Sequence, residues 1–305
     1  MKVYGEKFIK LSLDGGFTCP NRDGTLSFEG CVFCSENGSG EFSGAIIQGI
    51  KDEAADIRDQ VDHQKRMLSK KWSSTAYIAY FQNYTNTYKS IDALEVIYQA
   101  ALDNEGVRGL VVATRPDCIK MEHVDLFKRS KVMWVELGLQ TIHDDRAQWL
   151  NRHYGFEDFK TAYKRLLIAE IPVVVHLIAG LPGETKADFI KSVQVLSALG
   201  VFGVKFHMLN ILTGTQLDVL YNQNPFHLLT ETEYIEWICE AIEHLNPETV
   251  IHRLTGDGAR SMLVAPKWVL NKRRVLNGIN KSLVARNSIQ GMYYKNVTQS
   301  QSESC

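Results

Sequence analysis

The feature that most constrains this chain is a loop with three cysteines, which reads CPNRDGTLSFEGCVFC from Cys19 to Cys34. Eleven residues separate Cys19 from Cys31, and two separate Cys31 from Cys34. Thiolates bind iron–sulfur clusters, zinc or cuprous ions in preference to hard cations. Structural zinc takes four protein ligands, and a 4Fe–4S cluster commonly takes four cysteines. Because residues 12–51 contain no histidine and no further cysteine, the loop predicts a cluster with one iron open to a non-protein ligand.

The other residues of this loop fit a cluster-binding role. Proline, asparagine, aspartate and glycine recur in it, and these residues favour tight turns that aim backbone N–H groups at an anion. Phe33 lies between two of the cysteines and is expected to shield the cluster from water. The alternative is a disordered loop whose thiols have no common role.

Hydrophobic segments predict six alternations of strand and helix. The predicted strands are 8–13, 76–81, 109–114, 132–139, 173–178 and 204–209. The predicted helices are 46–70, 90–102, 121–129, 144–151, 156–169, 185–199 and 230–245, with Ser90 and Thr185 as N-terminal caps. Short apolar strands that alternate with helices are typical of a parallel sheet covered by helices. The pattern alone allows a doubly wound sheet or a barrel.

The cysteine loop, with an aromatic residue directly before its third cysteine, resembles that of the radical SAM superfamily. Its wide first gap resembles the branch that contains the catalytic subunit of Elongator, and in particular the bacterial YtqA/YhcC subgroup, over about residues 1–290. This resemblance implies an open partial (β/α)6 barrel. It also implies one 4Fe–4S cluster held by Cys19, Cys31 and Cys34, and S-adenosylmethionine as the second cofactor. Reductive cleavage of that cofactor would give a deoxyadenosyl radical, which takes hydrogen from a substrate.

In α/β barrels the active site lies at the carboxyl ends of the strands, and polar residues follow the strands here. The resemblance implies that some of these residues contact S-adenosylmethionine. The candidates are Phe33, Gln82, Asn83, Thr114, Arg115, Glu136, Gln140, Arg152, Ile178 and His207. The segment at Gln82 departs from the glycine-rich pattern that is usual in the superfamily. Residues 114–117 read TRPD, which looks like the same tetrapeptide in the Elongator branch.

Several of these candidates have ordinary structural alternatives. His176 and His207 lie in apolar strands, where a hydrogen-bonded core histidine is common. Arg115 and Arg152 are candidates to bind the cofactor carboxylate, and the alternative for Arg152 is to complement a helix C-terminus. Cys118 is a candidate hydrogen-atom donor to a substrate radical, and its alternative is a buried thiol that packs as a small apolar group.

Charge is distributed unevenly along the chain. Residues 251–305 contain nine Lys or Arg and two acidic residues, a balance of +7, whereas the first 250 residues carry −8. We therefore divide the chain into a core, 1–250, and a basic segment, 251–305. The basic segment predicts a polyanion partner, and a solvated helix face is the alternative. Together with the resemblance to the Elongator branch it predicts tRNA as substrate, with chemistry at the wobble uridine. The resemblance to the YtqA/YhcC subgroup implies that carboxymethylaminomethyl uridine is trimmed to aminomethyl uridine there. The predicted RNA contacts are Lys267, Lys272, Arg273 and Arg274, with Trp268, Tyr293 and Tyr294 available for stacking.

Other features limit the compartment and the chemistry. No apolar run reaches the roughly 18 residues that span a bilayer, and the N-terminus lacks a signal-peptide pattern. Cys118, Cys239 and Cys305 are scattered, which predicts a reducing cytoplasmic setting without a disulfide framework or a membrane partner. A radical SAM enzyme also needs an electron donor such as a flavodoxin or ferredoxin. The alternatives are a small-molecule or peptide substrate, a non-catalytic iron–sulfur or zinc module, and an ordinary barrel hydrolase or lyase.

The segment after residue 250 is expected to begin with a loop and to continue into a basic helix. The loop is predicted to contain His252, Arg253, Gly256 and Asp257, and the helix to begin near Pro266. Only about 50 residues remain there. The acetyltransferase domain of the Elongator subunit is therefore not expected.

Overall fold

The computed structural model describes residues 5–36, 38, 52–256 and 260–295. The chain divides into two compact units. Unit 1 comprises Met1–Gly30, Glu36–Gly138 and Glu157–Val173, and unit 2 comprises Cys31–Ser35, Leu139–Phe156 and Val174–Cys305. Each unit has its own parallel strands and its own helices. Within the described ranges, no helix is both long and apolar enough to cross a membrane.

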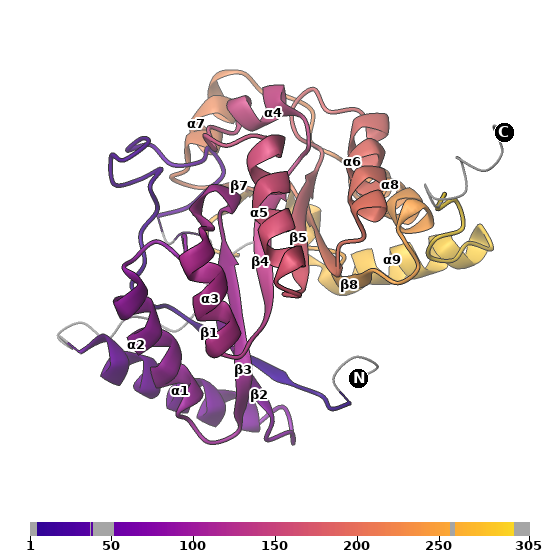
Figure 1. Ribbon diagram of the computed structural model, residues 1–305. Helices are drawn as coiled ribbons and strands as arrows, with labels where there is room; N and C mark the ends of the chain where they lie inside the picture. The colour runs from indigo at the N-terminus through magenta and orange to yellow at the C-terminus, as the bar shows by residue number, and fades with distance from the viewer. Residues whose placement is uncertain (1–4, 37, 39–51, 257–259, 296–305) are drawn as a thin grey trace, which may run out of the picture. The chain divides into compact units, whose positions relative to one another are not determined.

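Unit 1 is built on parallel strands, each paired with the next strand along the chain. These are β1 (Ile9–Leu13), β2 (Tyr77–Phe81), β3 (Val107–Thr114) and most of β4 (Val132–Gln140). The helices are α1 (Glu53–Ser69), α2 (Ile91–Leu102), α3 (Met121–Arg129) and nearly all of α5 (Phe156–Ile168), and η1 is a short 3-10 helix at Pro116–Cys118. Helix α2 packs against α1 and against β3 (Figure 1). Every residue of β2 is buried, as in a strand covered on both faces.

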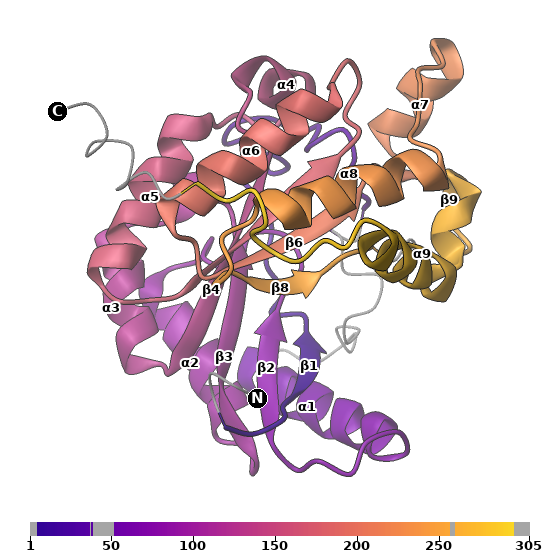
Figure 2. The same ribbon diagram turned by 90° about the vertical axis from the view of Figure 1, so that its right-hand side faces the viewer.

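Unit 2 contains nearly all of β5 (Val173–Ala179), with β6 (Gly203–Met208) and β8 (Val250–Arg253) parallel to it in that order. Its helices are α4 (Asp144–Trp149), α6 (Lys186–Leu199), α7 (Gln216–Gln223), α8 (Glu231–His244), the short 3-10 helix η2 (Lys267–Leu270) and α9 (Lys272–Ala285). Strands β7 (Ile211–Leu212) and β9 (Leu263–Ala265) form a small antiparallel pair. Figure 2 shows α6 and α8 side by side over β6 and β8, with α9 packed against α8.

Side-chain caps explain where several helices begin. The Ser90 hydroxyl accepts a hydrogen bond from the backbone N–H of Ala93 at the start of α2. Thr185 caps α6 and is part of a capping box with Asp188. Each cap satisfies a backbone N–H that has no partner inside its helix. The predicted caps at Ser90 and Thr185 are therefore confirmed.

The predicted alternation of strand and helix is confirmed. The strand order β1-β2-β3-β4 in unit 1 and β5-β6-β8 in unit 2 follows the chain, and each of the six predicted strands is present with bounds shifted by two residues or fewer. The first predicted helix, 46–70, corresponds to α1, which begins at Glu53, and residues 46–51 lie outside the described residues. The division of the chain at residue 250 stays a prediction.

One segment differs from its prediction. His252 and Arg253 were expected in a loop, but the structure places them in β8, which pairs in parallel with β6. The strand is short and only half-buried, and just two apolar residues precede its charged end, so its sequence pattern is weak. Gly256 follows the strand as expected, and Asp257 lies outside the described residues. The helix expected after Pro266 is confirmed as η2 followed by α9.

Candidate functional site

Cys19 begins a loop of unit 1 that is folded by its own backbone. The carbonyl of Cys19 accepts hydrogen bonds from the N–H groups of Arg22 and Asp23, at 2.8 and 3.2 Å. The N–H of Gly30 donates to the carbonyl of Asn21 at 2.6 Å, which closes the far side of the loop. Gly30 has a positive φ of 77°, a conformation that glycine adopts without strain. The loop thus holds Cys19 in a defined position, with its side chain half-buried.

Arg115 lies at the carboxyl end of β3, also in unit 1, and reaches the sulfur of Cys19. Its Nη1 donates toward Cys19 Sγ at 3.9 Å. Its Nε and Nη2 donate to the two carboxylate oxygens of Asp117, at 3.0 and 2.7 Å. The side chain is only 6% exposed. The TRPD segment therefore places a fixed positive charge beside the first cysteine of the loop.

Cys118 follows this segment within η1. Burial, with a further contribution from the Asp117 carboxylate, raises the pKa of the Cys118 thiol to about 12. The thiol is therefore protonated at neutral pH. A protonated thiol is what a hydrogen-atom donor requires, and that role stays a prediction.

Cys31 and Cys34 lie together on one turn of unit 2. The N–H of Cys34 donates to the carbonyl of Cys31 at 2.9 Å. Val32 anchors this turn, because its N–H donates to the carbonyl of Leu150 at 3.1 Å and its carbonyl accepts from the N–H of Leu217 at 2.8 Å. The side chain of Val32 belongs to a buried apolar cluster of unit 2, against which Phe33 also packs. The backbone of this turn is fixed, while Cys31 and Cys34 are only partly buried.

The three cysteines therefore fall into both units, with Cys19 in unit 1 and the other two in unit 2. Among the residues that the structure describes, no group of three or more His, Cys, Asp or Glu side chains is assembled closely enough to hold a metal ion. The donors still fit a thiolate-bound cluster, because all three are partly buried cysteines and Cys19 faces a guanidinium. Their role as cluster ligands stays a prediction.

Polar side chains meet at the carboxyl ends of β1 and β2. Asn83 is buried, and its Nδ2 donates to Asp14 Oδ2 at 2.9 Å. Gln60 from α1 binds both the N–H and the carbonyl of Asp14, at 2.9 and 2.8 Å. Burial raises the pKa of Asp14 above its ordinary value. Sequence reasoning missed Asp14, although an Asp-Gly-Gly segment directly after a strand was a usable signal. Gln82, the neighbouring candidate, is half-buried.

Glu136 is wholly buried and bonded within unit 1. Its carboxylate accepts from the hydroxyl of Tyr80 at 2.8 Å, from Nε1 of Trp134 at 3.1 Å and from Nζ of Lys10 at 3.4 Å. The Lys10 ammonium also lies 4.8 and 4.9 Å from the centres of the Tyr80 and Trp134 rings. These contacts hold the carboxylate in place, and a contact with the cofactor stays a prediction. Thr114 is likewise bonded internally, to the Thr87 hydroxyl at 2.6 Å.

Gln140 and Arg152 are connected in unit 2. Gln140 has a positive φ of 60°, and its Oε1 accepts from the Tyr154 hydroxyl at 3.2 Å. Arg152 is 0% exposed and donates to the carbonyls of Tyr154 and Thr141, at 2.9 and 3.2 Å. Its guanidinium carbon lies 4.7 Å from the centre of the Tyr154 ring. Arg152 thus orders the segment that orients Gln140, while binding of a cofactor carboxylate stays a prediction for it.

The glycine turn after β5 is held by a carboxyl group. Glu184 Oε2 accepts from the N–H groups of Gly180 and Leu181, at 3.0 and 3.3 Å. Arg146 donates to the carbonyl of Gly183 at 2.7 Å. Burial raises the pKa of Glu184 to about 8. Glycine is required at position 180, because an added Cβ would lie 2.6 Å from Leu229 and φ is positive.

The two candidates for the adenine contact lie on β5 and β6. Ile178 is buried in the apolar cluster that also contains Val32 and Leu181. Its partner in the β5–β6 register is His207, whose ring lies 5.2 Å from that of His176. The two histidines thus lie on the same face of the sheet of unit 2.

Some of the predicted RNA contacts are bonded to other residues of the protein, and others are exposed. Arg274 donates to Glu231 at 2.9 Å, and Lys267 Nζ donates to the carbonyl of Leu263. Arg273 is exposed on α9, as is Lys281, which the sequence did not single out. The indole N–H of Trp268 donates to the carbonyl of Leu229 at 2.9 Å, so that side chain is already packed in unit 2. Tyr293 is half-exposed.

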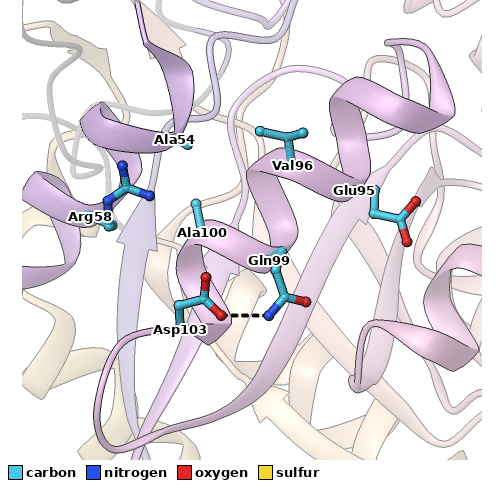
Figure 3. A pocket seen from close by; sticks show the side chains of 7 residues that line it. All are labelled: Ala54, Arg58, Glu95, Val96, Gln99, Ala100 and Asp103. Atoms are coloured by element: carbon cyan, nitrogen blue, oxygen red, sulfur yellow. Dashed lines mark hydrogen bonds between the residues drawn. The ribbon is translucent and has the colours of Figure 1, made fainter.

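A surface depression of about 360 Å³ lies between α1 and α2 in unit 1 (Figure 3). Its lining residues are Ala54, Arg58, Glu95, Val96, Gln99, Ala100 and Asp103. Glu95 is bonded to Arg129, and Gln99 donates to Asp103. None of the predicted site residues lines this depression.

Comparison with known proteins defines the class of this protein. The family model of the radical SAM superfamily matches residues 19–196, and that of the radical SAM C-terminal domain matches residues 201–285. The chain therefore belongs to the radical SAM superfamily. It is a radical SAM enzyme with that family's open partial (β/α) barrel fold, 4Fe–4S cluster and S-adenosylmethionine, and the non-catalytic and hydrolase alternatives are wrong.

Individual relatives support the predicted branch. The chain is 37% identical to YtqA of Bacillus subtilis over 295 residues, which cover 96% of this chain and 89% of YtqA. The solved structure of Elp3 from Methanocaldococcus infernus superposes with a TM-score of 0.69 at 18% identity, covering 77% of this chain and 60% of Elp3. A tRNA uridine(34) acetyltransferase of Methanocaldococcus infernus is 27% identical over 135 residues, which are 43% of this chain and 25% of that protein.

The Glu136 contacts predict a large effect on stability. Replacing Glu136 with Ala leaves the Lys10, Tyr80 and Trp134 donors without their acceptor, and we expect the free energy of unfolding to fall by about 3 kcal/mol. Tyr80→Phe removes one donor to the carboxylate and should cost less, about 2 kcal/mol. Urea denaturation of both variants measures the loss in free energy of unfolding, which should be larger for Glu136→Ala than for Tyr80→Phe. Equal midpoints for Glu136→Ala and the wild type would contradict it.

The pKa of Glu184 predicts how stability depends on pH. Between its ordinary pKa of 4.5 and about 8, the folded state binds more protons than the unfolded state, so this group lowers the free energy of unfolding as pH rises through that window. Glu184→Gln cannot ionise and should gain stability relative to the wild type from pH 5 to pH 8. Denaturation midpoints at several pH values test this, with Glu248→Gln at an exposed site as control. If the stabilities of Glu184→Gln and of the wild type changed in parallel with pH, the raised pKa of Glu184 would be refuted.

Proposed function

We propose that Cys19, Cys31 and Cys34 hold the cluster and that the enzyme acts on the wobble uridine of tRNA. When bound, the cluster and S-adenosylmethionine supply a radical that removes hydrogen from an unactivated C–H bond. The protein residues bind and orient the reactants. The half-exposed thiols supply three ligands, and Gln140, oriented by Tyr154, supplies an amide for the cofactor. Gly180 lets the backbone approach a flat group closely.

The observation that best supports an RNA substrate is the exposed face of α9. Residues 258–302 contain no Asp or Glu, and they include eight Lys or Arg. Val275 and Ile279 are buried, while Arg273, Asn277 and Lys281 follow one another at four-residue spacing on the exposed side. Neither Arg273 nor Lys281 forms an ion pair with any described residue. A face of cations and amides suits a phosphate backbone and base edges.

The proposed chemistry is removal of the carboxymethyl group from carboxymethylaminomethyl uridine. Hydrogen removal from the CH2 between its amine and its carboxylate would give a stabilised radical. Loss of one further electron from this radical to the cluster would give an imine, and water would then cleave the C–N bond, releasing glyoxylate and leaving the aminomethyl group. The name of the distant acetyltransferase relative, which specifies uridine 34 of tRNA, supports the same position. An electron donor such as a flavodoxin or ferredoxin would reduce the cluster.

A second candidate is a radical SAM enzyme with a small-molecule or peptide substrate. It is favoured by the acidic helix α8, since Arg274 pairs with Glu231 and Arg286 lies 3.8 Å from Glu243. Part of the basic segment would then serve only to neutralise its neighbour. The decisive test is nucleoside analysis of tRNA incubated with the reconstituted enzyme, S-adenosylmethionine and dithionite. Formation of aminomethyl uridine supports the tRNA proposal, and unchanged wobble uridines would favour the second candidate.

Ligand variants test the cluster assignment. Cys19→Ala, Cys31→Ala and Cys34→Ala should each lose the cluster after anaerobic reconstitution, because a site with two thiolates is incomplete. Iron and sulfide content and the absorption near 400 nm measure this loss. Cys239→Ala is the matched control, since Cys239 is buried in α8 and should leave the iron content unchanged. Full iron content in any of the three ligand variants would refute its assignment.

Charge variants test the RNA surface. The double variant Arg273→Gln/Lys281→Gln should weaken tRNA binding and reduce the slope of log affinity against log salt by up to about two units. Lys164→Gln/Lys191→Gln removes two exposed charges from other helices and is the matched control. Filter binding of an anticodon stem–loop at several salt concentrations gives both slopes. Equal slopes for the two double variants would exclude α9 as the RNA surface.

A further inference from the structure

The guanidinium of Arg115 is divided between a carboxylate and a cysteine sulfur. Two of its nitrogens donate to Asp117, at 3.0 and 2.7 Å, and the third, Nη1, lies 3.9 Å from Cys19 Sγ. All three residues belong to unit 1. Because Arg115 is 6% exposed, water screens these contacts little.

Local structure fixes this arrangement. Thr114 ends β3 and is bonded through its hydroxyl to Thr87, at 2.6 Å. Pro116 then starts the 3-10 helix η1, in which the N–H of Cys118 donates to the carbonyl of Arg115 at 3.2 Å. The turn returns Asp117 to the side chain of Arg115 only two residues away. The ion pair is therefore set by the TRPD sequence itself, and its third N–H donor is left to point at the loop.

A positive charge beside a ligand sulfur has a defined effect on a cluster. Reduction adds an electron, and hydrogen bonds and cations near the sulfur stabilise the more negative form. An arginine stays protonated throughout the physiological pH range, so its effect is constant. The Asp117 carboxylate opposes it with a charge of opposite sign at nearly the same place.

We propose that Arg115 and Asp117 together set the reduction potential of the cluster, with Arg115 raising it through Cys19 and Asp117 limiting that rise. The proposal rests on the assignment of Cys19 as a ligand. It makes Arg115 a tuning residue for the electron that the enzyme must accept, in addition to or in place of a contact with the cofactor carboxylate. Because the two side chains carry opposite charges, removing the charge of Arg115 and removing that of Asp117 should shift the reduction potential in opposite directions.

The test is a potentiometric titration of the reconstituted full-length enzyme, followed by electron paramagnetic resonance without S-adenosylmethionine. Arg115→Met should shift the midpoint to more negative values, and Asp117→Asn should shift it to less negative values. Each shift of 59 mV is a tenfold change in the ratio of reduced to oxidised cluster. Arg115→Lys keeps the charge and should lie between Arg115→Met and the wild type.

The outcomes separate this proposal from its competitors. Midpoints that do not move, with a higher dissociation constant for S-adenosylmethionine in Arg115→Met, would overturn it and make Arg115 a cofactor ligand. Shifts of the same sign in both variants would also overturn it, since they indicate a general disturbance. If Arg115→Met fails to assemble a cluster, the midpoint shift of Asp117→Asn still tests the proposal, because Asp117 is less buried than Arg115. Retention of the cluster by Cys19→Ala would instead refute the ligand assignment, which is a separate result.

Discussion

The structure depends on how polar groups are satisfied where parallel strands end. At such an end the backbone leaves the sheet, and its buried polar groups need partners. In unit 1, Asp14 after β1 binds Asn83 after β2, and Gln60 binds the backbone of Asp14 on both sides. In unit 2, the Glu184 carboxyl group binds two N–H groups of the turn after β5. Asn83, which the sequence predicts as a cofactor contact, is thus also a partner of the strand end at Asp14.

The hydrogen bonds that these side chains form within their own unit explain why the candidate residues are rigid. Glu136 has three donors, and the segment that orients Gln140 is fixed by the wholly buried Arg152. A ligand that meets such side chains need not order them, so the entropic cost of binding is smaller. The same arrangement means that substitutions at these residues will alter stability, so a change in cofactor affinity alone would not show that a residue contacts the cofactor. Variants must therefore be compared by folding measurements as well as by affinity.

The charged groups follow a similar logic on the surface. The acidic helix α8 takes Arg274 of α9 as a partner, while Arg273 and Lys281 of α9 are exposed and form no ion pair with any described residue. The net charge of the basic segment therefore overstates what is available to a polyanion. The proposed RNA surface rests on Arg273 and Lys281, and not on the sum of charges over the segment.

The sequence by itself determined the class of protein and most of the secondary structure. The spacing of Cys19, Cys31 and Cys34 and the alternation of apolar strands with helices are local patterns. The first indicated the superfamily, which the family comparison confirms, and the second indicated the strands and helices, which the structure confirms. It also indicated Ser90 and Thr185 as caps, because a cap acts within one helical turn. What only the tertiary structure decided is which side chains meet. Lys10 and Glu136 are 126 residues apart, and Asp14 and Asn83 are 69 apart, so no local pattern could pair them. Strand β8 escaped prediction for the same reason, since a short half-polar segment becomes a strand only when β6 offers it hydrogen bonds.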